Sequence, residues 1–205
     1  MATIKIYGVM FSTFTRTVCL AAHEKGVDYE FVPMRPSEVG SLNPVKKIPV
    51  MQHGDVTVFE SVAILRYLDR TFPGPKLWPD DARAATLADQ WSSVVGDSLA
   101  NSALRYIAAR MGFLPVPAEI EAKYLDKARE VVPAFEARLG ESRYLAGSAI
   151  TAADLYAFPL VAIFPAFPEL AAVLGASPNL KRWLAEMAAR PSAKATEPEM
   201  PRKAA

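Results

Sequence analysis

Along the first seventy residues, the spacing of the hydrophobic positions switches between strand-like and helix-like, which predicts alternating strands and helices. Residues 3–7 alternate in character and stop at Gly8, which predicts a strand. Residues 16–25 carry apolar side chains at helical spacing, and Gly26 follows as a typical helix C-cap. Residues 28–32 predict a second strand. We expect it to be parallel to the first, because a crossover helix joins the two.

The pattern continues with a loop, a hairpin and another helix. Residues 33–47 are rich in Pro, Ser and Asn, which predicts a loop with little regular structure. Residues 49–52 and 56–59 predict two short strands around the turn at residues 53–55. Residues 61–71 predict an amphipathic helix, because apolar side chains recur about three residues apart. This order of elements is the thioredoxin-like arrangement.

The second part of the chain has a different pattern. Residues 72–80 contain prolines and a glycine at a density that ends helices and is typical of a linker. Every long segment after it reads as helix: residues 81–112 (one helix or two in tandem), 117–140, 151–164 and 178–190. The sequence therefore predicts an α/β domain over residues 1–74, a linker over 75–80, an all-α domain over 81–190 and a loosely held tail over 191–205.

Composition narrows the function classes. The net charge is +1, which gives no reason to expect a nucleic-acid or anionic-membrane partner. Cys19 is the single cysteine, so no internal disulfide can form, and a reducing cytoplasm is the simplest location. The first residues run into a strand pattern without a signal-peptide core. The longest apolar stretch, residues 155–167, contains Pro159 and Pro165 and is too short to span a bilayer.

A cluster of hydroxyl residues follows the first predicted strand. Ser12, Thr13 and Thr15 lie just before an apolar helical pattern, where a hydroxyl usually serves only as an N-cap. Such a hydroxyl can also stabilise a bound thiolate. Lowering a thiol pKa from about 8.5 by roughly two units requires about 2.7 kcal/mol, which one charge-assisted hydrogen bond plus a helix N-terminus can supply. The chemistry alone does not choose among the three hydroxyls.

Two further segments suit the other parts of a peptide ligand. Ile48-Pro49 lies before a short strand. Trans is the usual form of an X-Pro bond, but in the thioredoxin-like arrangement a cis proline at this place presents the preceding backbone to a bound peptide, so we expect this bond to be cis. Glu60-Ser61 opens a helix, whose free N–H groups favour a carboxylate. The tripeptide glutathione has a sulfur, an extended backbone and a γ-glutamyl carboxylate. The segments together therefore match a site that holds glutathione and ionises its thiol.

These motifs also carry a resemblance to a known family. Residues 6–8 and 12–18 resemble the opening of the cytosolic glutathione S-transferases that use serine, most like the phi and related bacterial branches. Residues 43–50 and 59–64 resemble the second and third glutathione-contact segments of that family. Residues 144–154 resemble its helical-domain signature, in which a Thr-x-x-Asp capping box opens a helix.

The resemblance implies a fold and an activity. The fold is a thioredoxin-like N-terminal domain followed by an all-helical C-terminal domain. The activity is attack of the glutathione thiolate on electrophilic hydrophobic acceptors, as in detoxification, by a cytoplasmic homodimer without a metal. Two alternatives stay open: a glutathione-dependent isomerase, dehalogenase or peroxidase on the same fold, and a non-catalytic protein of this fold that binds partners.

The resemblance also implies roles for individual residues. Ser12 matches the catalytic serine, and the glutathione-binding positions are Ser12, Lys47, Ile48, Pro49, Glu60 and Ser61. Lys47 stands where many relatives have glutamine or another polar residue. The partner of the glycyl carboxylate is not fixed, and Arg35, Lys46 and Lys47 are the alternatives.

Other residues attract attention with less support. An acceptor pocket is expected from Phe11, Phe14, Tyr106, Met111 and Phe113, with Trp91 as a further candidate, although ordinary core packing explains each of the helical-domain residues more simply. Cys19 lies inside the first predicted helix, which favours a core thiol over a catalytic one. His23 and His53 lie on different kinds of element, and no acidic or histidine cluster has the spacing of metal ligands.

Overall fold

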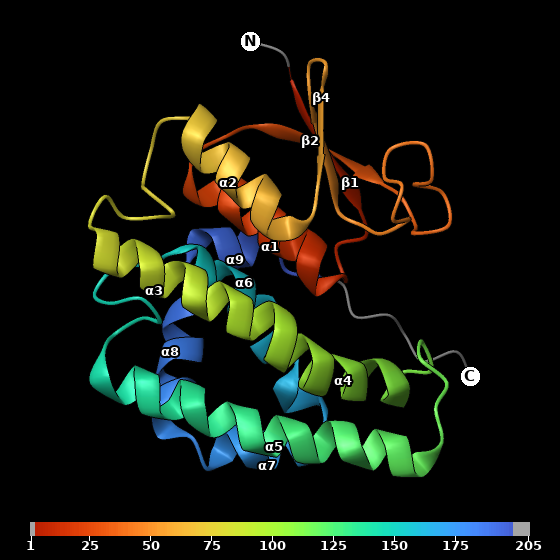
Figure 1. Ribbon diagram of the computed structural model, residues 1–205, viewed down its shortest axis with the longest axis vertical. Helices are drawn as coiled ribbons and strands as arrows, with labels where there is room; N and C mark the ends of the chain where they lie inside the picture. The colour runs from red at the N-terminus through yellow and green to blue at the C-terminus, as the bar shows by residue number, and fades with distance from the viewer. Residues whose placement is uncertain (1–2, 199–205) are drawn as a thin grey trace. The chain divides into compact units, whose positions relative to one another are not determined.

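The computed structural model describes residues 3–198 of the chain (Figure 1). The described residues form two compact units. One unit contains residues 3–78 together with residues 189–198, and the other contains residues 79–188. Residues 189–198 thus belong with the first unit, although they are far from it in the sequence, and local sequence patterns do not reveal this.

The first unit contains a four-stranded sheet with the order β2-β1-β3-β4. Its strands are β1 (Ile4–Gly8), β2 (Tyr29–Pro33), β3 (Val50–His53) and β4 (Val56–Phe59). β1 and β2 pair in parallel, whereas β1 with β3 and β3 with β4 pair antiparallel. This is the sheet that the alternating pattern predicts, and it confirms the thioredoxin-like class.

Two helices of this unit pack on each other and on the sheet: α1 (Thr13–Glu24) and α2 (Ser61–Thr71). They lie side by side on one face of the sheet (Figure 1). The buried residues of α1 are Thr13 and all those from Thr15 through Ala22, and they hold the helix against the core. α1 begins earlier than residue 16, because Ser12 caps it and adds a first turn.

The end of the expected linker is part of the first unit. Residues 73–76 are exposed, as a linker should be, but Leu77 and Trp78 are 2% and 5% exposed. The carboxylate of Asp69 accepts hydrogen bonds from the backbone N–H groups of Leu77 at 2.8 Å and Trp78 at 3.2 Å. The structure therefore differs from a linker over residues 75–80, because these two apolar side chains are buried and their backbone is tied to α2.

The structure also differs from the expectation of a loosely held tail over residues 191–205. Helix α9 (Pro191–Ala195) packs against α1. Just before α9, the Arg190 guanidinium donates to both carboxylate oxygens of Glu24, at 2.7 and 2.6 Å. The physical reason for the ordered segment is thus a two-pronged ion pair with a residue far away in sequence. Residues 199–205 lie outside the described residues.

The second unit is helical. Its elements are α3 (Ala82–Ser93), the π-helix η1 (Val94–Leu104), α4 (Arg105–Arg110), α5 (Ala118–Glu141), α6 (Ala152–Val161), the 3₁₀-helix η2 (Phe164–Ala166), α7 (Pro168–Gly175) and α8 (Pro178–Ala188). The expected long helix over residues 81–112 is thus a continuous run of α, π and α turns. Residues 81–190 lie entirely within the described chain and contain no strand, only an isolated bridge between Tyr144 and Gly147.

None of the helices formed by residues 3–198 is both long and apolar enough to cross a bilayer by itself. One pair, residues 152–166 with residues 168–175, reaches that length and composition only in combination, and it is bent by 114°.

Candidate functional site

The strand register brings three segments of the first unit to one end of the sheet. Tyr7 near the end of β1 pairs with Val50 at the start of β3, and Val50 pairs with Phe59 at the end of β4. Because both pairs are antiparallel, the chain leaves β1, enters β3 and leaves β4 at the same end. The segments that carry Ser12, Ile48-Pro49 and Glu60-Ser61 therefore start or finish there, as binding of one ligand by all three requires.

Ser12 is the N-cap of α1. Its backbone is extended, with φ −66° and ψ 121°, and its Oγ accepts a hydrogen bond from the Thr15 backbone N–H at 3.4 Å. The Ser12 side chain is half-buried, so a ligand can reach it. Because the oxygen serves as the acceptor of the cap, the hydroxyl proton remains to be donated. No acidic side chain lies in the first turn of α1, so the positive end of the helix dipole is not offset there.

The rival hydroxyls are less accessible. Thr13 is 6% exposed and Thr15 is fully buried. Thr15 Oγ1 has no hydrogen-bond partner among the described residues, and it lies where a Cβ on Gly8 would collide with it. Its hydroxyl therefore faces the end of β1. Burial, which sequence reasoning could not supply, favours Ser12 among the three.

The Ile48–Pro49 peptide bond is cis, which confirms the prediction for this bond. Ile48 is half-buried and Pro49 is buried, whereas Lys47 is exposed. The residue before them in the turn, Lys46, has φ 56° and so adopts the left-handed conformation that a side chain disfavours. The Lys47 ammonium on this exposed turn is available to a carboxylate.

Glu60 and Ser61 form the N-terminus of α2. Glu60 has φ 69°, a conformation that costs a non-glycine residue on the order of 1–3 kcal/mol and is typical of functional sites. The Glu60 side chain is exposed and makes no capping hydrogen bond, so it does not cover the first N–H groups of α2. Ser61 is the first helical residue and is 6% exposed. This end of α2 thus offers backbone donors, a hydroxyl and a carboxylate.

The expected acceptor residues have different surroundings. Phe11 and Phe14 flank Ser12 in the first unit and are half-buried. Met111 and Phe113 lie in the turn after α4, and Phe113 is 66% exposed, so both are accessible in the helical unit.

Tyr106 is a core residue. It is 2% exposed, and its ring contacts Phe167 edge-to-face at 6.3 Å between centroids. Burial and the hydrogen bond that its hydroxyl donates to Glu169 raise the pKa of Tyr106 to about 12. Trp91 is likewise packed, 7% exposed and 4.9 Å from the Phe135 ring. The core interpretation therefore suits both aromatic residues better than an acceptor pocket.

Cys19 is fully buried, and this burial raises its pKa to about 11. The thiol is therefore neutral near neutral pH and is a poor nucleophile. His23 contacts Tyr29 through its ring, and His53 Nδ1 lies 2.8 Å from the Tyr67 hydroxyl. Across residues 3–198, no group of His, Cys, Asp or Glu side chains has a geometry that could hold a metal ion.

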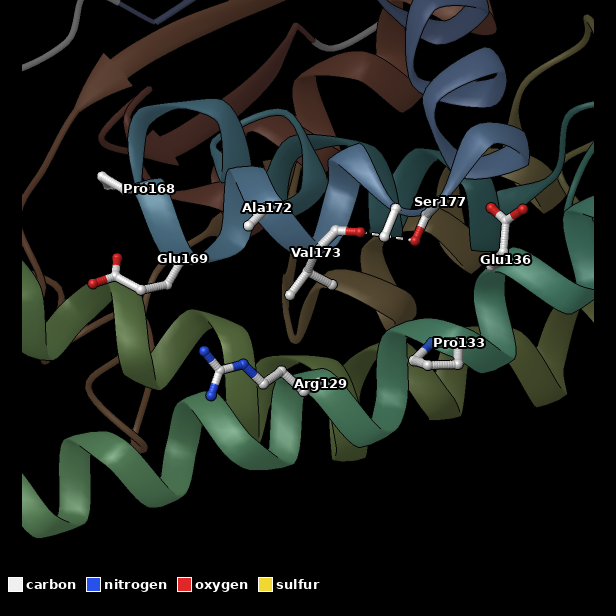
Figure 2. Close-up of a pocket in the computed structure, with 9 residues that line it drawn as sticks. Arg129, Pro133, Glu136, Pro168, Glu169, Ala172, Val173 and Ser177 are labelled. Atoms are coloured by element: carbon white, nitrogen blue, oxygen red, sulfur yellow. Dashed lines mark hydrogen bonds between the residues drawn. The ribbon is translucent and has the colours of Figure 1, made fainter.

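A cavity of about 710 Å³ lies elsewhere, between α5 and α7 of the helical unit (Figure 2). Its lining residues are Arg129, Pro133, Glu136, Pro168, Glu169, Ala172, Val173, Ala176 and Ser177. The Glu136 carboxylate accepts the backbone N–H groups of Asn179 and Leu180 at 3.1 and 2.9 Å, and so caps α8. The Ser177 hydroxyl donates to the Val173 carbonyl at 2.9 Å. This cavity contains none of the site residues expected from the sequence.

The turn that leads to Ile48 contains a buried polar residue that the sequence patterns do not predict. Asn43 is only 1% exposed, and its amide group bonds the backbone on both sides of the turn that leads to Ile48. An Asn-Pro pair is a turn signal, which could have drawn attention to its side chain. In the sequence, Asn43 stands out only as part of the segment 43–50.

Two family profiles match most of the chain. The family profile described as "Glutathione S-transferase, N-terminal domain" matches residues 6–76, and "Glutathione S-transferase, C-terminal domain" matches residues 95–191. Glutathione S-transferase 4 of Zea mays is 34% identical over 98% of this chain and 96% of its own length.

Solved structures share the fold. Glutathione S-transferase III in its apo form superposes with a TM-score of 0.87 at 28% identity, over 98% of this chain and 99% of the other. Glutathione S-transferase I from maize, in complex with an atrazine–glutathione conjugate, has a TM-score of 0.84 at 29% identity, over 95% and 96% of the two chains. The chain therefore belongs to the glutathione S-transferase family.

Proposed function

We propose that this protein transfers the thiolate of glutathione to electrophilic carbon atoms of apolar acceptors, and that Ser12 is the catalytic residue. The observation that carries the proposal is the Ser12 N-cap. Its half-buried hydroxyl accepts the helix N–H and keeps its own proton for a ligand. It stands at the sheet end where the Ile48 and Ser61 segments also meet.

In this mechanism the Ser12 O–H donates to the glutathione sulfur, and the N-terminus of α1 adds a positive electrostatic potential that favours the negative sulfur. Both interactions stabilise the thiolate over the thiol, so the thiol proton is lost to solvent near neutral pH. The sulfur electron pair then forms a bond to the acceptor carbon. The leaving group departs with the electron pair of the bond that breaks. The protein contributes thiolate stabilisation and positioning.

The remaining contacts follow from the charges of glutathione. The γ-glutamyl ammonium suits the exposed Glu60 carboxylate, and the adjacent carboxylate suits Ser61 and the N–H groups of α2. The cysteinyl backbone pairs with the backbone of Ile48, beside Pro49, as an added strand would. The glycyl carboxylate suits Lys47, with Arg35 and Lys46 as the alternatives.

The family resemblance also supports a cytoplasmic homodimer. The maize structure contains a conjugate of atrazine, so aryl chlorides of this kind are a sensible first class of acceptor to test. A panel that also includes epoxides, peroxides and isomerisable substrates separates conjugation from the other reactions of this fold.

The test is calorimetric titration with glutathione at millimolar concentration, followed by ultraviolet titration of the thiolate in the complex. We expect saturable heat, thermal stabilisation of the protein and a bound thiol pKa roughly two units below that of free glutathione. Absence of both heat and thermal stabilisation contradicts the proposal. S-methylglutathione serves as the control ligand, because it binds through the same backbone but has no ionisable thiol.

A further inference from the structure

Asn43 organises the turn that leads into the glutathione site. Its Nδ2 donates to the Lys47 carbonyl at 2.8 Å, and its Oδ1 accepts the Val45 backbone N–H at 2.9 Å. Its own carbonyl accepts the Lys46 N–H at 2.9 Å, and its own N–H donates to the Val39 carbonyl at 3.0 Å. One residue that is 1% exposed thus bonds four points of the surrounding backbone.

The rest of this turn has little packing to hold it. Residues 44–47 are all exposed, and Val45 retains 51% of its accessible surface. Lys46 is also held in the left-handed region at φ 56°, which costs a residue with a side chain on the order of 1–3 kcal/mol. Because the exposed side chains contribute little burial, the hydrogen bonds of Asn43 are what maintain the shape of the turn.

The bond to Lys47 acts directly on the ligand-binding backbone. The carbonyl of Lys47 and the N–H of Ile48 belong to one peptide group, which is planar. A hydrogen bond that fixes the carbonyl direction therefore fixes the direction of the Ile48 N–H as well. Accepting this bond also polarises the peptide group, which makes the N–H a better donor.

We infer that Asn43 is a positioning residue for glutathione: its side-chain amide orients the Lys47–Ile48 peptide group that pairs with the cysteinyl backbone of the ligand. The inference rests on the proposed function, because it concerns the same site. It assigns Asn43 to ligand affinity, whereas Ser12 sets the ionisation of the thiol. The two roles are separable by experiment.

The test replaces Asn43 with aspartate, which keeps the acceptor for Val45 and removes the donor to Lys47. We expect Asn43→Asp to weaken glutathione and S-methylglutathione by the same factor, about tenfold each, because one oriented hydrogen bond is lost. At saturating glutathione, kcat should stay within about twofold and the bound thiol pKa within about half a unit. Asn43→Ala removes both side-chain bonds and should weaken both ligands further.

Asn101→Asp is the matched control, because the Asn101 amide also donates to a backbone carbonyl at 2.8 Å, but on the exposed face of η1. It should leave both affinities unchanged. Thermal unfolding of each variant identifies the temperature range in which its fold is intact, and the affinities are compared within that range.

The outcomes separate the two claims. If the unchanged protein binds neither ligand, the proposed function fails. If it binds both and Asn43→Asp binds them equally well, the inference about Asn43 is wrong. Weaker binding of glutathione but not of S-methylglutathione also overturns the inference, because it places the effect at the sulfur. A parallel loss of kcat at saturation overturns it as well, because it indicates damage to the general structure.

Discussion

Ser12 and Thr151 are both hydroxyl residues at helix N-caps, but their surroundings differ. Ser12 at α1 is half-buried and makes one long capping bond of 3.4 Å. Thr151 at α6 is 1% exposed and forms a full capping box with Asp154. The hydrogen bonds at α6 are satisfied within the protein, whereas the role proposed for Ser12 is to donate its proton to a ligand. Under this proposal one cap serves stability and the other chemistry, and accessibility is what distinguishes them.

At the N-terminus of α6, the capping carboxylate of Asp154 accepts hydrogen bonds from several groups of the protein itself. The buried Asp154 carboxylate accepts the Leu145 and Thr151 backbone N–H groups, at 2.9 and 3.0 Å. It also accepts the Thr151 hydroxyl at 3.0 Å and the Trp183 indole N–H at 2.9 Å. Burial raises the pKa of Asp154, and these hydrogen bonds oppose that rise. The carboxylate connects α6, α8 and the preceding loop.

The largest effect is expected at this purely structural cap. Asp154→Ala should lower the free energy of unfolding by about 3–5 kcal/mol, because it leaves several buried donors without an acceptor. Urea unfolding measures the loss. In the fraction of this variant that stays folded, the pKa of the bound glutathione thiol should be unchanged. Asp126→Ala is the control, because Asp126 is 66% exposed and its ion pair with Arg129 is at the surface, so the change should stay within about 0.5 kcal/mol.

Ser12→Ala should have the opposite effect to Asp154→Ala: a large change in the thiol pKa and a small change in stability. The pKa of the bound thiol should rise by one or two units, and turnover near neutral pH should fall roughly ten- to hundredfold. The stability loss should not exceed about 1 kcal/mol, because the cap bond is long and half-buried. Titration of thiolate absorbance checks the pKa, and calorimetry should show that binding changes much less. A thiol titration that stays in place in Ser12→Ala removes the catalytic assignment.

The sequence predicted the first unit better than the second, for a physical reason. β-Strands and α1 show their period within short windows, and the sheet end that unites Ser12 with Ile48 and Ser61 follows from strand order. Helix α7 is not predicted, because residues 155–174 are almost entirely apolar, with Glu169 as the one charged side chain, which removes the periodic signal. The π turns of η1 were missed because their side-chain pattern differs little from a long helix.

The site shows the same division between local and tertiary information. Residue types identified the candidate segments, but burial was needed to favour Ser12 over Thr13 and Thr15. Burial also assigned Tyr106 to the core. The order of α9 depends on a contact between Glu24 and Arg190, which are 166 residues apart. No local pattern could predict it.

A substitution at Glu24, at the C-terminal end of α1, tests whether the stability of the protein and the ionisation of the thiol can be changed separately. Glu24 is half-buried, which raises its pKa, but the hydrogen bonds from Arg190 and Ser192 outweigh this partial burial, so the pKa is lowered overall. Glu24→Gln should lower the free energy of unfolding by about 1–2 kcal/mol at neutral pH. The thiol pKa should be unchanged, since the Ser12 cap is intact.

The pH dependence of that loss follows from the lowered pKa. The folded state favours ionised Glu24, so its contribution is complete above the unfolded pKa of about 4.3. It disappears as the pH falls through the lower folded pKa. Urea unfolding between neutral pH and pH 3 should therefore show the unchanged protein and Glu24→Gln converging in acid. A constant difference across that range contradicts the ion-pair account.

The smallest expected effect concerns Thr15, one of the two rival hydroxyls beside Ser12. Thr15→Val keeps the backbone N–H that caps onto Ser12 and removes a buried hydroxyl that has no partner among the described residues. We expect stability to rise by about 1 kcal/mol, because an unsatisfied buried hydroxyl is replaced by a methyl group of similar shape. Thr17→Val is the matched control, since the equally buried Thr17 hydroxyl donates to the Thr13 carbonyl at 3.0 Å and its removal should bring no gain. Thiolate titration decides the chemistry: an unmoved pKa in Thr15→Val keeps the proton donor at Ser12, and a rise of a full unit transfers the role to Thr15.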